Sequence, residues 1–328
     1  MPAITFQDAD AIRAVQSRMS PPSRLGDKAF EWLTLAMASA VVVLVILIGW
    51  ELWNGSSLAI KKFGFHFLTT STWDPVAEQF GALPFIYGTV VSSLIALIIA
   101  VPLSIATAIY LTELAPLWLR QPITSLIEML AAIPSVILGL WGIFVMIPFL
   151  RDYPFPLLKK FFGWTGLFTG PIYGVSMLAG GIIIAIMILP IITSVSREIL
   201  RSVPNLQREA AYALGATRWE VTRIAVLSYA KKGLFGAVIL GLGRALGETM
   251  AVTMVIGNTP QIALSLFKPG YTLASVIANE FTEATTDLYL QALFAIALVL
   301  FGITILANLV AQLLLKTLGG SSTTKAVQ

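Results

Sequence analysis

Long apolar runs without charge are the feature of this chain that most restricts its fold. A helix needs about 20 residues to cross a hydrocarbon core roughly 30 Å thick. Pro102 and Pro134 lie inside two of the runs, where a membrane helix tolerates a kink. The sequence therefore predicts an all-α, polytopic membrane protein with six transmembrane helices, at approximately Phe30 to Trp50, Pro84 to Tyr110, Ile123 to Ile147, Tyr173 to Ser194, Leu234 to Ile256 and Leu290 to Leu315.

The composition agrees with this fold class and excludes several functions. Hydrophobic residues make up 57% of the 328 residues and charged residues 12%, roughly half the charged fraction of a soluble domain. There is no cysteine and one histidine, His66, so neither a thiolate site nor a histidine cluster is available. We expect no metal, no cofactor and no nucleic-acid partner, because a net charge of +4 is explained by basic loops beside a lipid bilayer.

The distribution of Lys and Arg predicts the orientation of the spans. With both termini inside, the cytoplasmic face holds 14 basic residues and the opposite face holds 6. Because basic residues collect in cytoplasmic loops, we predict an N-in, C-in topology. The predicted organisation is a cytoplasmic tail at 1–28, a six-helix domain at 29–318 and a second cytoplasmic tail at 319–328.

A long polar loop, residues 195–233, separates the fourth and fifth predicted spans. Asn205 is a good N-cap for a first helix, and Gly215 is the left-handed residue that commonly ends one. Thr217 and Glu220 then have the spacing of a capping box. The loop is expected to form two short helices that meet at a glycine. Such a hairpin suits docking to a partner, and the alternative is an ordinary solvated connection.

Two charges lie near the middle of the fifth predicted span. A charge at the centre of a membrane helix costs about 2.5 to 3.5 kcal/mol on insertion scales, so it normally faces a partner or a polar interior. Arg244 and Glu248 are four residues apart and would share one helix face. One interpretation is a structural ion pair between packed helices. The other is a site on a solute path, since a guanidinium donates paired hydrogen bonds to an oxyanion such as phosphate.

The loop also carries a recognisable motif. Glu209-Ala210-Ala211, followed after three residues by Gly215, resembles the EAA loop of bacterial ABC importer permeases. In those proteins the coupling helix of this loop sits in a groove of the ATPase subunit. Ala225 and Ser228 depart from the usual pattern, in which a larger aliphatic residue and a proline are common. The resemblance implies that the ATPase-coupling residues are Glu209, Ala210, Ala211 and Gly215.

Further strings are similar to the phosphate permeases of the PstC family, over most of residues 80–315. They are Ala132-Ile-Pro-Ser-Val136, Gly139-Leu-Trp-Gly142, Gly243-Arg-Ala-Leu-Gly-Glu-Thr-Met-Ala-Val252 and Val255-Ile-Gly-Asn258. The resemblance implies a type I ABC importer permease fold in the bacterial inner membrane, with Arg244 and Glu248 functional. It also implies the partners: a PstA-like second permease, a PstB-like ATPase dimer, a PstS-like phosphate-binding protein and inorganic phosphate.

The implied mechanism is alternating access driven by the ATPase, and this chain itself is not expected to be an enzyme. It has no Gly-rich loop ending in Lys-Ser or Lys-Thr that could hold ATP phosphates. Two alternatives remain open at this point. One is a permease for another oxyanion, such as sulfate or molybdate. The other is an ion-coupled secondary transporter, in which buried Arg and Glu would form a gate or proton relay.

Overall fold

A computed structural model of the protein describes residues 24–319. The predicted tails, 1–28 and 319–328, lie almost wholly outside these residues. The chain divides into two compact units, residues 1–51 and 52–328, and each is described by itself. Within the described part, the strands are the two short strands of one antiparallel hairpin, β1 (Trp73–Asp74) and β2 (Gln79–Phe80).

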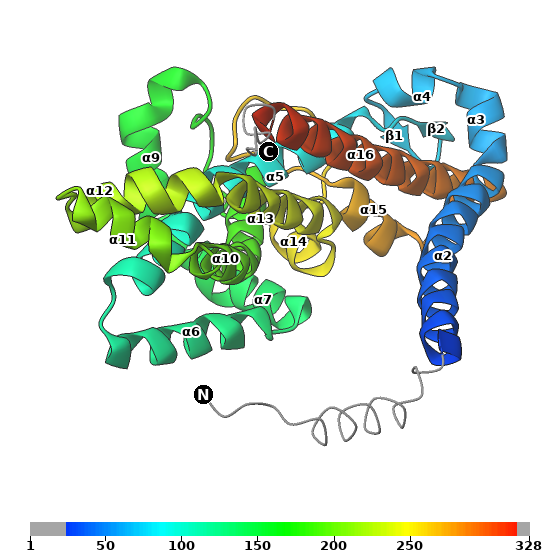
Figure 1. The fold of residues 1–328 in the computed structure, drawn as a ribbon. Helices are drawn as coiled ribbons and strands as arrows, with labels where there is room; N and C mark the ends of the chain where they lie inside the picture. Colours follow the sequence, from blue (N-terminus) through cyan, green and yellow to red (C-terminus); the bar gives the residue numbers. More distant parts are fainter. Residues whose placement is uncertain (1–23, 320–328) are drawn as a thin grey trace, which may run out of the picture. The chain divides into compact units, whose positions relative to one another are not determined.

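Six helices in the described part are long and apolar enough to cross a membrane, which confirms the predicted all-α, polytopic fold (Figure 1). They are Gly26–Gly55, Leu83–Leu114, Ser135–Asp152, Met177–Arg201, Arg218–Gly247 and Asp287–Thr317. The first belongs to α2 (Arg24–Gly55), which exposes Leu, Val and Ile along its length. A helix that is apolar all round requires an apolar surrounding, as a bilayer provides.

The fourth span, α10 (Met177–Arg201), is the centre of the second unit. It packs against α5 (Leu83–Ile109) and α13 (Leu227–Gly247) over most of its length. Glycine allows the closest of these approaches, since a Cβ at Gly181 would lie 2.5 Å from Cγ2 of Ile95. Small residues at such contacts let membrane helices pack tightly without a hydrophobic driving force. The second unit is therefore built around α10.

The third span differs from the prediction of one helix from Ile123 to Ile147. A separate helix, α6 (Leu117–Ala131), ends just before Pro134. The span itself is α7 (Ser135–Trp141), the π-helical turn η2 (Gly142–Met146) and α8 (Ile147–Asp152). Proline has no N–H to continue a helix and disfavours helical backbone at the residue before it. Pro134 therefore separates two helices, where the prediction had a kink within one.

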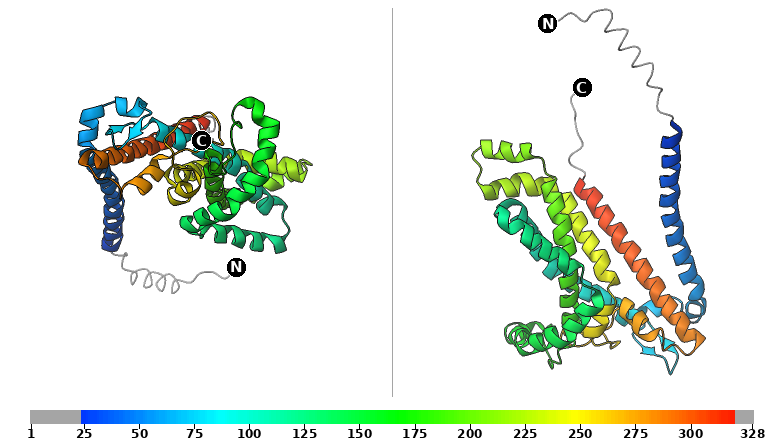
Figure 2. Two further views of the ribbon diagram at one scale, coloured as in Figure 1. Left: turned by 180° about the vertical axis from the view of Figure 1, so that it is seen from behind. Right: turned by 90° about the horizontal axis from the view of Figure 1, so that it is seen from below.

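The two ends of the bundle in the second unit are different in character (Figure 2). One end carries the helical hairpin after α10, described below. The other carries the β1–β2 hairpin, α15 (Leu273–Glu280) and the start of α16 (Asp287–Gly319). There the Glu280 carboxylate accepts hydrogen bonds from Trp73 Nε1 at 2.8 Å and from the Tyr289 hydroxyl at 2.7 Å. These bonds fix an aromatic cluster at that end. The remaining short helices are α3 (Ser57–Phe63), α4 (His66–Thr69), α9 (Pro154–Phe162), η3 (Gly163–Thr165) and α14 (Met250–Val255).

Candidate functional site

The loop after α10 folds into a hairpin with one short arm and one long arm. The short arm is α11 (Asn205–Ala213). The long arm begins with α12 (Arg218–Val221) and continues through the π-helical turn η4 (Thr222–Val226) into α13. The prediction of two short helices is therefore wrong for the second, which is the beginning of the fifth span.

The residues that end and begin the hairpin helices follow the sequence signals with one exception. Gly215 has a φ of 82°, in the left-handed region that glycine adopts freely. The Thr217 and Glu220 capping box is present, with the Thr217 N–H donating to the Glu220 carboxylate at 2.7 Å. Asn205, however, is not the N-cap. Pro204 occupies that position, and the Asn205 side chain accepts a hydrogen bond from Arg208 instead.

Most of α11 is exposed, including apolar side chains that a solvated connection would not need. Leu206 is 75% exposed and Leu214, in the turn, is 90% exposed. Glu209 and Ala210 lie on this outer surface, while Ala211 is half-buried. An exposed apolar patch with a charged residue beside it is typical of an interaction surface. We call the exposed residues Leu206, Glu209, Ala210 and Leu214 the hairpin surface.

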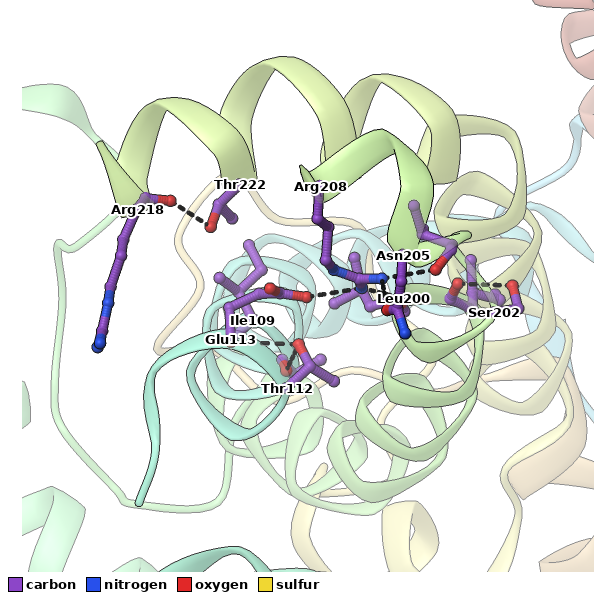
Figure 3. Close-up of polar contacts among 12 residues, drawn as sticks. Ile109, Thr112, Glu113, Leu200, Ser202, Asn205, Arg208, Arg218 and Thr222 are labelled. Atoms are coloured by element: carbon purple, nitrogen blue, oxygen red, sulfur yellow. Dashed lines mark hydrogen bonds and ion pairs between the residues drawn. The ribbon is translucent and has the colours of Figure 1, made fainter. Parts of the chain in front are cut away.

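Arg208 is the charged residue of α11 that points inwards, and no pattern in the sequence predicts this role. Figure 3 shows its guanidinium between the end of α10 and Glu113. Glu113 belongs to the π-helical turn η1 (Tyr110–Leu114), which closes the second span. The Arg208 Nη2 to Glu113 Oε1 distance is 3.0 Å. The two residues are 95 positions apart, so no local pattern connects them.

Arg244 borders a cavity of about 560 Å³ between the fourth, fifth and sixth spans. Its side chain is exposed in this chain. Beside it, a Cβ added at Gly243 or Gly236 would meet nothing within 4 Å, so the glycines leave the cavity open. Asn308 of α16 supplies a second polar side chain. The lining residues are Ile191, Gly236, Ile239, Leu240, Gly243, Arg244 and Asn308.

The structure does not place Glu248 on the same helix face as Arg244. Helix α13 ends at Gly247, and Glu248 has extended backbone angles, φ −69° and ψ 126°. Its side chain is buried, while Arg244 is exposed. Within the described part of the chain, no ion pair of 4.0 Å or less joins the two side chains. The predicted contact across one helical turn is therefore not formed, because the helix ends before Glu248, and the two opposite charges attract each other only at longer range.

Comparison with known proteins defines the class of membrane protein to which this chain belongs. A family model described as the binding-protein-dependent transport system inner membrane component matches residues 100–319, which include the hairpin and Arg244. A crystal structure of a bacterial alginate ABC transporter, in complex with an alginate-bound periplasmic protein, contains a chain of the same fold. The TM-score is 0.57 at 18% identity, covering 88% of this chain and 96% of that chain. The predicted ABC importer permease fold is thus confirmed.

Relatives that share one name specify the family further. The phosphate transport system permease protein PstC of Mesorhizobium japonicum is 50% identical over 313 residues, covering 93% of this chain and 96% of the relative. That of Xylella fastidiosa is 46% identical over 287 residues, covering 86% and 88%. The chain belongs to the PstC family of permease proteins. Membership of an ABC importer family excludes the ion-coupled secondary transporter.

Proposed function

We propose that this chain is the membrane-spanning permease subunit of an ATP-driven importer of inorganic phosphate in the bacterial inner membrane. The observation that carries the proposal is the 50% identity to a phosphate transport system permease over 93% of the chain. The partners are a PstA-like second permease, a PstB-like ATPase dimer on the cytoplasmic side and a PstS-like phosphate-binding protein outside. The ATPase hydrolyses ATP, and this chain forms part of the solute pathway.

The cavity beside Arg244 is the proposed phosphate path. A guanidinium stays charged at every physiological pH and matches two phosphate oxygens with its planar fork. Asn308 adds an amide that donates to one oxygen and accepts from another, so it can bind the P–OH of a partly protonated phosphate. Sulfate is fully ionised and has no such proton. The two side chains together therefore favour a protonated oxyanion.

The hairpin surface is the proposed ATPase contact. It combines exposed apolar side chains with Glu209, a carboxylate at the surface of α11. The long arm of the hairpin is helical from Arg218 to Gly247, and this helix includes Arg244. ATP-driven movement of the ATPase at the hairpin would then reach the cavity through one helix. This connection fits transport by alternating access.

The test is reconstitution of the complete complex in liposomes. The chain is co-purified with the second permease and the ATPase, and the binding protein is added outside. We expect ATP-dependent uptake of labelled phosphate that excess unlabelled phosphate removes and excess sulfate or molybdate does not. Uptake of labelled sulfate or molybdate at the phosphate rate would overturn the substrate assignment. Purification without an ATPase would overturn the coupling assignment.

A further inference from the structure

Arg208 makes four hydrogen bonds, which reach the end of α10, the link that follows it, α11 itself and η1 (Figure 3). Its Nη1 donates to the Val203 carbonyl at 2.5 Å and to Asn205 Oδ1 at 3.3 Å. Its Nη2 donates to the Leu200 carbonyl at 2.9 Å and to Glu113 Oε1 at 3.0 Å. The carbonyls of a last helical turn have no partner within their helix, so Arg208 completes the end of α10. One side chain of α11 thus joins the fourth span to the end of the second.

The ion pair is shielded from water, unlike the rest of α11. The Arg208 and Glu113 side chains are 17% and 14% exposed. Surface ion pairs contribute little because water and salt screen them, whereas a shielded pair that loses one partner leaves an unpaired charge. The other ion pairs of the hairpin end each include a carboxylate that is more than half exposed. Among the ion pairs described at this end, the Arg208–Glu113 pair therefore has both of its partners shielded from water.

The position of Glu113 determines which elements of the bundle the ion pair connects. Glu113 lies in η1, the π-helical turn that closes the second span, and such turns are frequent at functional sites. Apart from Arg208, α11 packs mainly on α12 and η4, which belong to the fifth span. Without the ion pair, α11 keeps its packing on the fifth span and the Arg208 bonds to the Leu200 and Val203 carbonyls at the end of the fourth span. With it, α11 is joined to the second span as well.

We propose that the Arg208 and Glu113 ion pair is the link that transmits movement of α11 to the second span. The two residues are positioning residues for transport, and neither contacts the solute. This inference rests on the proposed function in one respect, namely that an ATPase docks on α11. It adds a second route of transmission beside the continuous helix of the fifth span.

Glu113→Ala isolates the link, because it leaves the Arg208 bonds to the Leu200 and Val203 carbonyls in place. The matched control is Glu128→Ala. Glu128 pairs with Arg197 at 3.4 Å at the same end of the bundle, on α6, and this pair does not include α11. Glu113→Gln is the conservative variant, since an amide oxygen still accepts a hydrogen bond but carries no charge.

The experiment uses the complete complex in liposomes and measures three quantities: co-purification of the ATPase, ATP hydrolysis with loaded binding protein, and phosphate taken up per ATP hydrolysed. Coupling between distant sites typically amounts to about 5- to 150-fold, so we expect Glu113→Ala to lower uptake per ATP at least about fivefold. Assembly and hydrolysis should persist. Glu113→Gln should fall between Glu113→Ala and the wild type, and Glu128→Ala should match the wild type.

Two results would overturn the link. One is an unchanged uptake per ATP in Glu113→Ala. The other is loss of the assembled complex in both Glu113 variants, which would make the pair a requirement of folding or docking only. The wild-type complex tests the proposed function separately. If it transports sulfate or molybdate, the substrate assignment fails, and uptake per ATP measured with that anion still decides the link.

Discussion

At the scale of the residue, the cavity beside Arg244 separates a pathway role from a packing role. A packing pair needs a partner, and no ion pair joins Arg244 to Glu248 in the part of the chain that the structure describes. Arg244 instead faces open space beside two glycines. A permanent charge that lines a cavity between membrane spans, in the last turn of the fifth span, is expected to serve a solute.

Neutralising Arg244 should therefore slow transport strongly without harming assembly. Hydrogen bonds to charged groups contribute about 1.5 to 3 kcal/mol, so Arg244→Gln should lower phosphate uptake per assembled complex by about 10- to 100-fold. Arg244→Lys keeps the charge but loses the fork and should be less impaired. The double variant Arg244→Gln with Glu248→Gln should stay as defective as Arg244→Gln. Full uptake by the double variant would instead establish a packing pair.

Asn308 gives a second prediction at this scale. Asn308→Leu keeps the approximate size of the side chain and removes both its donor and its acceptor. We expect a higher KM for phosphate and a smaller preference for phosphate over sulfate in competition assays. Thr304→Val is the control, because the Thr304 hydroxyl donates to the Leu300 carbonyl of its own helix at 2.8 Å. Equal competition profiles for both variants and the wild type would remove Asn308 from the path.

At the scale of the element, the hairpin depends on the backbone of Gly215. A Cβ there would meet nothing within 4 Å, so crowding is not the constraint. The constraint is the φ of 82°, which β-branched residues strongly disfavour and Asn tolerates. Gly215→Val should weaken co-purification of the ATPase and lower uptake, while Gly215→Asn should keep both. Equal loss in the two variants would show that the position matters for a reason other than backbone conformation.

A substitution on the outer surface of α11 should disturb docking of the ATPase without disturbing the hairpin itself. Ala210 is exposed, so Ala210→Trp fits without displacing any residue of the hairpin. A bulky ring would, however, hold the ATPase away from the hairpin surface. We expect the variant to insert normally and to lose ATPase co-purification. Wild-type co-purification and transport would mean that the ATPase contacts another surface.

The same elements show how far the sequence predicts the fold. Uncharged apolar runs are sufficient to find six spans, because a bilayer imposes that length on every helix. They are not sufficient to find the break before Pro134, because an apolar run has the same composition whether it forms one helix or two. The same limit applies at Gly247. The spacing of Arg244 and Glu248 implies a shared face only if the helix continues, and it ends between them.

Only part of the candidate site can be predicted from the sequence. Charges within apolar runs are conspicuous, so Arg244 was identified, whereas Asn308 is uncharged and was not. Arg208 directly precedes the motif at Glu209, but its partner Glu113 lies in another span. A contact between residues 95 positions apart follows from the packing of the spans and has no periodic signal in one sequence.

At the scale of the whole molecule, the orientation in the membrane is a prediction that the cysteine-free sequence makes easy to test. Thr72, next to β1, and Gln207, in α11, are both exposed. The β1–β2 hairpin and α11 lie at opposite ends of the bundle (Figure 2). In intact cells, Thr72→Cys should react with an impermeant thiol reagent and Gln207→Cys should not. After permeabilisation both should react. Labelling of Gln207→Cys in intact cells would reverse the N-in, C-in assignment.

The unbroken helix from Arg218 to Gly247 has a thermodynamic consequence. Arg218 and Arg244 are 26 residues apart, so about 39 Å of rod separates them at about 1.5 Å per residue. If anion binding at one end of this helix favours one tilt, the affinity for the ATPase at the other end depends on the same tilt. Linkage then requires the effect to be mutual, so phosphate in the cavity changes the affinity of the hairpin for the ATPase by the same factor as the ATPase changes the affinity for phosphate.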